Sequence, residues 1–197
     1  MYGEKVMPTT NEIFCNVLDS QNLQLVLVGE SDALPLFHAV EDALESLRKF
    51  PATLAWALEE PSYETSLSFC RHAITALNAQ TDLIYLIKSR ASPVHVIGVI
   101  GLHHLKKNVS EAELGFWCRT TEQGKGQMLE AAKTLVAYAM SELQINKIHA
   151  LVEEKNTASR KLCARMAMHI DATLLNDRKN PVSNQFVSIV RYVIESV

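Results

Sequence analysis

The sequence predicts a mixed α/β domain in which strands and helices alternate along a single chain. Short runs rich in Leu, Val and Ile recur between longer segments whose apolar residues follow helical spacing, and no linker, repeat or low-complexity tract divides them. The 197 residues, 48% hydrophobic and 21% charged, are enough for one domain with a full core. The expected element order is β, α, α, β, β, β, α, β, α, β, β.

The first part of the chain is expected to hold one strand and two helices. Residues 1–22 are polar and irregular, so we expect a flexible or partly helical lead-in, followed by a single domain at 23–197. The run LQLVLV at 23–28 predicts the first strand. Helices are expected at about 33–50 and 61–79, because Ser and Asp residues suited to helix capping precede apolar residues at helical spacing.

The second part is expected to alternate strands with two more helices. Segments dense in β-branched and aromatic residues, bounded by turn residues, predict strands at 82–88, 95–103, 113–118, 147–152, 170–175 and 186–194. A long helix is expected at about 126–143, where the apolar residues share one face, and a short helix at about 156–168.

The composition argues against several classes of protein. A formal net charge of -3 gives no electrostatic case for binding nucleic acid or an anionic membrane. No apolar run reaches the roughly 18 residues that span a bilayer, and the N-terminus lacks the apolar segment of a signal peptide, so we expect a cytoplasmic protein. We expect reduced thiols and no metal site, because no metal-ligand spacing connects Cys15, Cys70, Cys118 and Cys163.

Two glycines one residue apart, Gly124 and Gly126, stand directly before the long helix. A turn entering a helix presents backbone N–H groups that have no partner inside the helix, and with the helix dipole they suit a phosphate group. Glycine removes the Cβ that would hold an anion away, and Lys125 adds a positive charge. The spacing alone fits an ordinary turn equally well, and it is neither the P-loop nor the dinucleotide-binding motif.

The segments around this loop carry a more specific resemblance. The strand before it reads Glu113-Leu-Gly-Phe-Trp117, the loop reads Gln123-Gly-Lys-Gly-Gln-Met128, and the strand after it leads into Asn156-Thr-Ala-Ser159. In this order and at these distances the segments resemble the GNAT family of acyl-CoA N-acyltransferases, in particular its ribosomal-protein N-acetyltransferase (RimJ/RimL-like) branch. The resemblance covers roughly residues 23–193.

The resemblance implies the GNAT fold, a twisted and mostly antiparallel sheet with splayed central parallel strands flanked by helices. It also implies acetyl-CoA as cofactor, with the pyrophosphate on the N–H groups of the loop and the pantetheine arm between the splayed strands. The residues implied to bind the cofactor are Trp117, Cys118, Arg119, Gln123, Gly124, Lys125, Gly126, Gln127, Met128, Asn156 and Ser159.

Three side chains are candidates for catalysis by resemblance. Glu113 matches the glutamate that serves as base, directly or through water, and the alternative is a solvent-facing Glu. Cys163 stands seven residues after Asn156, where many members place a Tyr that protonates the leaving thiolate, and the alternative is simple packing. Ser159 is a candidate to anchor the cofactor sulfur or acyl group, or else it bonds the helix start.

For four other side chains the sequence allows a functional role or a structural one. Asp171 falls where this branch often has a Glu, so the resemblance makes it a further residue to consider for catalysis. His103 and His104 are adjacent on a strand and therefore point to opposite faces, so we expect surface or packing roles. Trp56 either lines the acceptor cleft or belongs to the core.

Two positions depart from the family pattern. Met128 stands where Gly or Ala is usual, and Ala167-Met168 stands where Gly-Phe is usual. These departures and the missing Tyr keep open a catalytically silent acyl-CoA-binding or regulatory domain.

The expected reaction is transfer of an acetyl group to a primary amine, by direct attack in a ternary complex. At pH 7, deprotonating a lysine of pKa about 10.4 costs roughly 4.6 kcal/mol, whereas an α-amine of pKa about 7.8 costs about 1.1 kcal/mol. The N-terminal amine of a ribosomal or other protein is therefore the favoured acceptor, with a polyamine, an aminoglycoside or an amino-acid derivative as the small-molecule alternative. We expect a monomer or homodimer, with residues 31–80 forming much of the acceptor wall.

Overall fold

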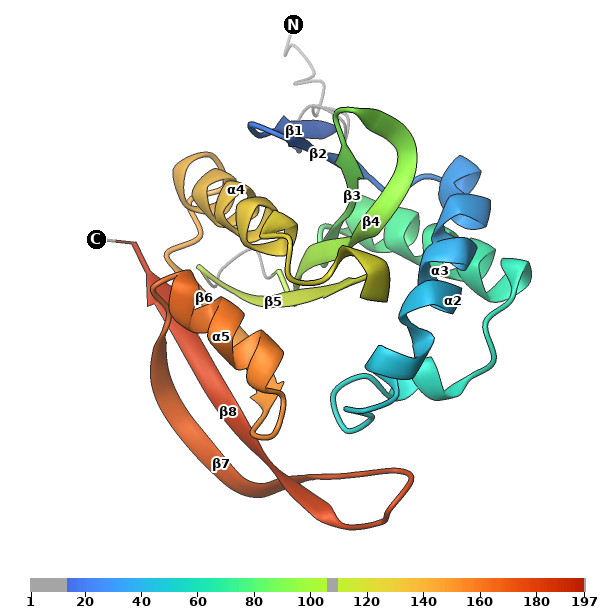
Figure 1. Ribbon diagram of the computed structural model, residues 1–197. Helices are drawn as coiled ribbons and strands as arrows, with labels where there is room; N and C mark the ends of the chain where they lie inside the picture. The colour runs from blue at the N-terminus through green and yellow to red at the C-terminus, as the bar shows by residue number, and fades with distance from the viewer. Residues whose placement is uncertain (1–13, 106–109, 197) are drawn as a thin grey trace, which may run out of the picture.

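The computed structural model describes residues 14–105 and 110–196, which fold around one mixed sheet (Figure 1). The strand order is β1-β2-β3-β4-β5-β6-β8-β7. The strands are β1 (Val17–Asp19), β2 (Leu23–Leu27), β3 (Leu83–Ser89), β4 (Ser92–His103), β5 (Glu111–Cys118), β6 (Lys147–Glu153), β7 (His169–Lys179) and β8 (Phe186–Glu195). The mixed α/β prediction is confirmed.

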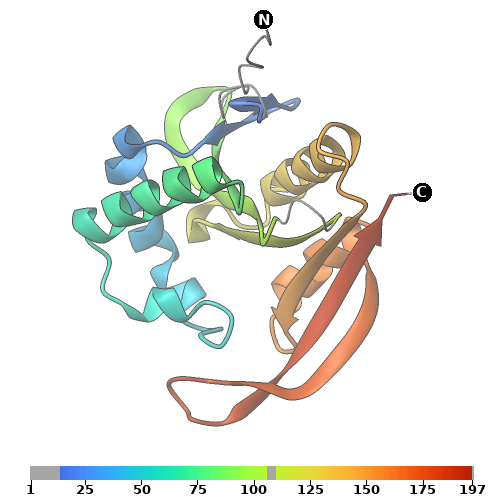
Figure 2. The same ribbon diagram turned by 180° about the vertical axis from the view of Figure 1, so that it is seen from behind.

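Helices cover both faces of the sheet (Figures 1 and 2). They are α2 (Ala33–Leu47), α3 (Tyr63–Ala79), α4 (Gln127–Ser141) and α5 (Thr157–Arg165), with the 3₁₀ turns η1 (Glu30–Asp32), η2 (Ala55–Leu58) and η3 (Thr120–Glu122). None of the helices in this part of the chain is both long and apolar enough to cross a lipid bilayer.

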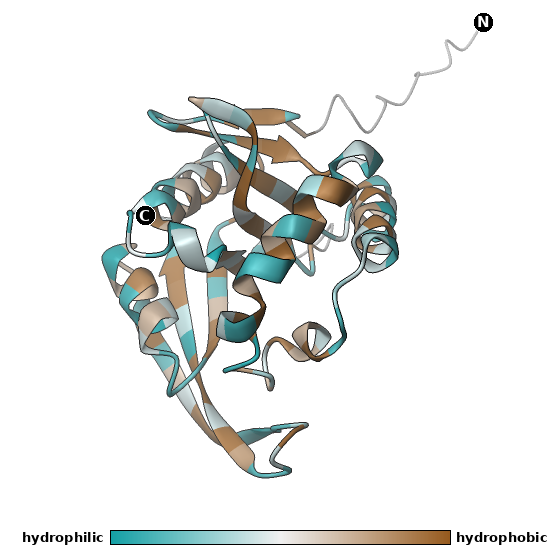
Figure 3. Ribbon diagram, turned by 45° about the vertical axis from the view of Figure 1, so that its right-hand side comes forward, coloured by the Kyte–Doolittle hydropathy of each residue, from teal (hydrophilic) through white to brown (hydrophobic). Residues whose placement is uncertain are grey.

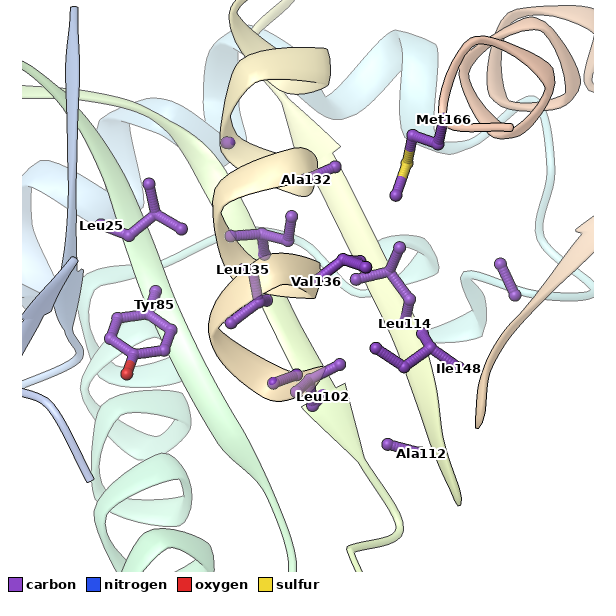
Figure 4. Packing of buried hydrophobic residues seen from close by; sticks show 14 of the residues in the cluster. Leu25, Tyr85, Leu102, Ala112, Leu114, Ala132, Leu135, Val136, Ile148 and Met166 are labelled. Atoms are coloured by element: carbon purple, nitrogen blue, oxygen red, sulfur yellow. The ribbon is translucent and has the colours of Figure 1, made fainter. Parts of the chain in front are cut away.

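The alternation of side chains along the strands divides the core between the two faces. Leu135 and Val136 of α4 pack with Leu114 of β5 and Ile148 of β6 in one cluster (Figure 4). Helices α2 and α3 pack against the opposite face, where residues such as Leu86 point. Figure 3 shows the hydrophobic colour concentrated on the central strands, as expected for a sheet that is covered on both sides.

The only parallel pairing in the described sheet joins β5 to β6, and it is short. Three pairs connect these strands: Glu111 with Lys147, Ala112 with Ile148, and Glu113 with His149. Beyond Glu113 and His149, β5 continues to Cys118 and β6 to Glu153, but the two strands no longer pair with each other. The two strands therefore diverge toward their C-terminal ends, which confirms the expected splayed parallel pair.

The start of the domain differs from the expectation for residues 1–22. Val17–Asp19 forms β1, which pairs antiparallel with β2, and Phe14 and Leu18 are buried in the core. A strand of three residues among polar neighbours is too short to show an alternation of apolar and polar side chains, so the sequence did not predict it. Residues 1–13 of that expected lead-in lie outside the described residues.

The end of α5 also differs from the expected boundary at residue 168. The helix ends at Arg165, and Ala167 takes the left-handed conformation with φ of 61°. The N–H of Met168 donates to the carbonyl of Cys163, and the N–H of Ala167 to that of Ala164, which together form a Schellman cap. Met168 is buried, as expected for a residue that takes the place of Phe.

Candidate functional site

The first cavity lies where β5 and β6 diverge, and it encloses about 350 Å³. It is bounded by the end of β5, the loop into α4, the start of α5 and the C-terminal end of α2. The cofactor candidates that line it are Trp117, Cys118, Gln123, Gly124, Gly126, Met128, Asn156 and Ser159.

The loop before α4 presents open backbone to this cavity. Gly124 and Gly126 have φ of 77° and 83°, in the left-handed region that favours glycine. A Cβ on either residue would have no atom within 4 Å, so the space in front of the loop is open. The first N–H groups of α4, starting at Gln127, have no carbonyl partner within the helix. The loop is therefore shaped to bind an anion.

Side-chain contacts tie this loop to its neighbours. Gln123 Nε2 donates to Ser46 Oγ of α2 at 3.0 Å. Lys125 Nζ lies 2.9 Å from Glu122 Oε2, and His95 Nε2 lies 3.1 Å from Oε1 of the same carboxylate. The hydrogen bond from Lys125, opposed by burial and aided by His95, lowers the pKa of Glu122. The charge that we expected Lys125 to offer the cofactor is therefore already paired within the loop.

Two other cofactor candidates have defined structural partners. Asn156 caps α5, because its Oδ1 accepts the N–H of Ser159 at 3.1 Å, and both residues line the first cavity. Arg119 points elsewhere: its Nε donates to the Val96 carbonyl at 2.6 Å, and its Nη1 lies 3.5 Å from Asp42 Oδ2. Arg119 thus joins β4 to α2 and is outside the lining of the first cavity.

The residues of the first cavity fit an acyl-CoA. The glycine loop and the N-terminus of α4 offer N–H donors to a pyrophosphate. The gap between β5 and β6 leaves backbone groups of β5 unpaired on that side beyond Glu113, as an extended pantetheine arm would need. Gln127 lies outside the cavity lining, but its Oε1 is buried and has no hydrogen-bond partner in the described part of the chain.

The second cavity encloses about 460 Å³ on the face of the sheet covered by α2 and α3. Its walls are largely apolar, and Trp56 is among them, 5.9 Å from Trp117 between ring centroids. The acidic residues that line it are Glu59, Glu60 and Glu113. The two cavities share Leu54, Phe116 and Trp117, so they lie next to each other.

Glu113 lies in the second cavity, at the point where β5 and β6 begin to diverge. Its Oε2 is 3.7 Å from His149 Nε2 and 3.8 Å from His104 Nε2. Hydrogen bonding with His149, opposed by burial and aided by the nearby His149, His104 and Arg178, lowers the pKa of Glu113. The carboxylate is therefore ionised at neutral pH and is a weak proton acceptor.

His103 differs from the surface or packing role that we expected. Its ring lines the second cavity together with Glu113, which is its register partner on β5. The two histidines are not adjacent strand residues as we expected, because β4 ends at His103 and His104 follows it with φ of 59°. Strand alternation therefore does not apply to His104, whose Nε2 lies 3.8 Å from the carboxylate of Glu113. No signal in the local sequence distinguishes a strand face that is packed from one that lines a cavity.

The remaining catalytic candidates occupy different environments. Cys163 is fully buried in the core and lines neither cavity, and burial raises the pKa of its thiol to about 12. This burial favours the packing alternative for Cys163. Asp171 lies on β7 and pairs with Arg191 at 3.1 Å, outside both cavities. Ser159 remains in the first cavity.

Several lining residues were not identified from the sequence. Ser46, Leu47, Phe50 and Leu54, at the end of α2 and in the following loop, contribute a wall of the first cavity. Their segment was expected to form the acceptor wall, and it does line the second cavity through Leu54 and other residues. Its contribution to both cavities depends on how α2 docks, which the sequence alone does not reveal.

Within residues 14–105 and 110–196, no group of three or more His, Cys, Asp or Glu side chains is arranged to hold a metal ion.

Comparisons with known proteins agree on the fold. RimL, a ribosomal L7/L12 α-N-protein acetyltransferase in complex with coenzyme A, has a TM-score of 0.82 at 18% identity, covering 91% of this chain and 97% of RimL. MccE, a microcin C7 self-immunity acetyltransferase in complex with acetyl-CoA and AMP, has a TM-score of 0.79 at 16% identity, covering 90% of this chain and 94% of MccE. At these identities the likeness establishes the architecture.

Two curated relatives match over shorter stretches. YdaF of Bacillus subtilis (strain 168), named provisionally as a ribosomal N-acetyltransferase, is 33% identical over 69 residues, which are 35% of this chain and 38% of YdaF. The uncharacterized N-acetyltransferase p20 of Bacillus licheniformis is 32% identical over 84 residues, which are 43% of this chain and 47% of p20. The matched stretches thus span less than half the length of either relative.

The match to a family is more extensive. Residues 22–169 match the acetyltransferase (GNAT) domain, and this range contains the loop before α4, Glu113 and the start of α5. Because the match covers well over half of the chain, this protein belongs to the acetyltransferase (GNAT) domain family.

Proposed function

We propose that this protein transfers an acetyl group from acetyl-CoA to the N-terminal α-amine of a protein or peptide. The observation that carries the proposal is the pair of cavities that share Leu54, Phe116 and Trp117. Two cavities in contact allow both substrates to be held at once, as direct transfer in a ternary complex requires. The cofactor, when bound, supplies an activated acetyl thioester.

The residues of the first cavity hold the cofactor in this proposal. The N–H groups around Gly124 and Gly126 bind the pyrophosphate, and Asn156 and Ser159 lie beside the arm. Cys118 also lines this cavity, and burial raises the pKa of its thiol to about 11, so it remains a neutral thiol at pH 7. Its neutral thiol adds no charge to the site.

The residues of the second cavity select a cation. Glu59 and Glu113 add carboxylates to a largely apolar lining, which suits an ammonium group attached to a short apolar side chain. The carboxylate of Glu60, also in the lining, is paired with Arg48 at 2.7 Å. The low cost of deprotonating an α-amine, about 1.1 kcal/mol at pH 7 against roughly 4.6 kcal/mol for lysine, favours a protein N-terminus. Ribosomal proteins are candidates because RimL acts on ribosomal L7/L12. We place this activity in the cytoplasm.

The experiment compares acceptors at saturating acetyl-CoA, with coenzyme A release followed by chromatography. The panel holds peptides with a free α-amine, the same peptides N-blocked but carrying lysine, a polyamine and an aminoglycoside. A kcat/KM at least tenfold higher for free α-amines supports the proposal, whereas better turnover of a polyamine or aminoglycoside contradicts it. Thermal stabilisation by acetyl-CoA without turnover of any acceptor would instead support a silent acyl-CoA-binding domain.

The variant Glu113→Gln tests the second cavity directly. Removing one charged partner of an ammonium costs about 1.5–3 kcal/mol, so kcat/KM for the acceptor should fall by about 10- to 100-fold. Thermal stabilisation by coenzyme A should stay as in the parent chain, because Glu113 lies outside the first cavity. Unchanged kcat/KM would remove Glu113 from the site.

A further inference from the structure

The ring of His103 lies on a floor made of two glycines. His103 is the last residue of β4. A Cβ built on Gly115 of β5 would lie 2.9 Å from His103 Nε2, and one built on Gly101 of β4 would lie 3.4 Å from it. The two missing side chains leave the space that the imidazole fills, inside the second cavity.

Asp82 fixes the orientation and the tautomer of this ring. Asp82 Oδ1 lies 2.9 Å from His103 Nδ1 and accepts the backbone N–H of His104 at 3.4 Å. Its Oδ2 accepts the hydroxyl of Thr81 at 2.9 Å. A carboxylate only accepts hydrogen bonds, so Nδ1 of the neutral ring carries the hydrogen and Nε2 presents its lone pair to the cavity.

The register of the strands places Nε2 close to the junction of the cavities. Side chains on one face of a strand recur about every 6.6 Å, and Glu113, Gly115 and Trp117 occupy successive positions on β5. His103 Nε2 lies against the Gly115 position. Trp117 borders both cavities. His103 Nε2 is therefore closer to Trp117 than the Cα of Glu113 is, by one side-chain position along β5.

We propose that His103 accepts the proton of the acceptor ammonium, and that Asp82 is its positioning residue. The inference rests on the proposed function and deepens it. The N–H bond of the ammonium breaks, its electron pair stays on nitrogen as the nucleophilic lone pair, and the proton forms the Nε2–H bond. The imidazolium then returns the proton to solvent.

Glu113 and His103 have different roles in this proposal. Glu113 remains ionised and attracts the cation, because its neighbours stabilise the carboxylate. The neutral imidazole of His103 instead offers the lone pair of Nε2 to the ammonium, as general-base transfer requires. Asp82 contacts the His103 ring, and Glu113 is the register partner of His103. Glu59 and Glu60 line the same cavity, and Glu60 is paired with Arg48.

The test is a pH profile of kcat/KM for the best free-amine peptide, at saturating acetyl-CoA. His103→Asn keeps a donor for Asp82 but removes Nε2, and kcat/KM at pH 7 should fall by about 10²-fold or more. The loss should shrink as pH rises, since the amine then deprotonates without help. Asp82→Asn removes the charge that stabilises the imidazolium and should move the acidic limb of the profile to lower pH. His72→Asn, an exposed histidine on α3, is the matched control and should match the parent.

A second readout does not depend on turnover. Nitrogen NMR of the ¹⁵N-histidine-labelled chain, assigned with His103→Asn, should show a protonated Nδ1 and an unprotonated Nε2 at pH 8. An Nε2–H tautomer, or an unchanged profile in His103→Asn, overturns the role of His103. Absence of turnover by the parent chain with every amine contradicts both the transfer activity and the catalytic role, whereas normal turnover with an Nε2–H tautomer contradicts the role of His103 alone.

Discussion

Gly98 carries no functional group, yet it sets how closely β4 and β5 approach beside the first cavity. A Cβ on Gly98 would lie 2.2 Å from the carbonyl oxygen of Trp117 and 2.7 Å from the Cα of Cys118. These are backbone contacts that no side-chain rotation relieves. The position of Trp117, which both cavities share, thus depends on a residue that lines neither cavity.

Gly126→Ala should weaken cofactor binding and also destabilise the fold. Its φ of 83° costs an alanine about 1–2 kcal/mol, although the space around the new Cβ is open. The melting temperature should fall by about 2–8 °C, and the stabilisation by coenzyme A should shrink. Gly29→Ala is the control, because Gly29 has φ of -124° and a Cβ there meets only ordinary contacts from 3.6 Å. Equal coenzyme A stabilisation in both variants would contradict the role of the loop.

Ala167→Gly should stabilise the protein. Ala167 is exposed and takes φ of 61° after α5, where glycine avoids a strain of roughly 1 kcal/mol. The melting temperature should rise by about 2–4 °C, with kcat/KM unchanged because the residue lines neither cavity. A lower melting temperature would show that chain entropy in the unfolded state outweighs the strain.

At the level of elements, the local patterns predicted much of the secondary structure. Helices α2, α3 and α4 follow one apolar stripe each, and Ser62 caps α3 by accepting the N–H of Thr65. The strand β1 was missed, because its three residues are stabilised by pairing with β2 rather than by a pattern of their own. Tertiary contacts decide such short elements.

One inter-element contact joins the splayed strand β6 to the loop that follows α2. Glu153, the last residue of β6, is buried, and its Oε1 accepts the N–H groups of Ala52 and Thr53 at 2.9 and 3.2 Å. The loop residue Leu54 borders both cavities. Glu153 of β6 therefore anchors the loop that contributes Leu54 to both cavities.

Replacing Glu153 by Ala should loosen this loop. The part-buried N–H of Ala52 would lose its acceptor, at a cost of about 1–3 kcal/mol when unpaired, whereas that of Thr53 keeps the Phe50 carbonyl at 3.3 Å. The melting temperature should fall and KM for the acceptor should rise several-fold, with a smaller change in kcat. Glu153→Gln retains an acceptor oxygen and should lie between the parent and Glu153→Ala. An Ala variant with parental KM would show that the loop holds its position without Glu153.

At the scale of the whole molecule, the motifs predicted residues of the first cavity better than those of the second cavity. Gly126, Asn156 and Glu113 lie in short motifs whose spacing survives folding, so their places were predictable. His103 belongs to the site only because α2 and α3 cover its face of the sheet at a distance, leaving a cavity. Long-range docking of helices leaves no local trace in the sequence, which explains why the acceptor side was predicted only as a segment.

The reactivity of each cysteine thiol depends on how far the fold buries it. Burial raises the pKa of Cys70 and Cys118 to about 11 and that of Cys163 to about 12, whereas Cys15 is exposed. The thiolate is the reactive form, so at pH 8 the folded protein should take up iodoacetamide first at Cys15. Peptide mass spectrometry after a short pulse checks this order, with labelling in denaturant as the control. Rapid labelling of Cys163 in the folded chain would contradict its burial.

The side chains shared by the two cavities have a thermodynamic consequence. A ligand that moves Leu54, Phe116 or Trp117 from one side alters the free energy of binding on the other side. Linkage makes this effect reciprocal: if coenzyme A changes the Kd of an acceptor by some factor, the acceptor changes the Kd of coenzyme A by the same factor. Under the proposed function, the Kd of coenzyme A and the Kd of the acceptor are then linked through these three side chains.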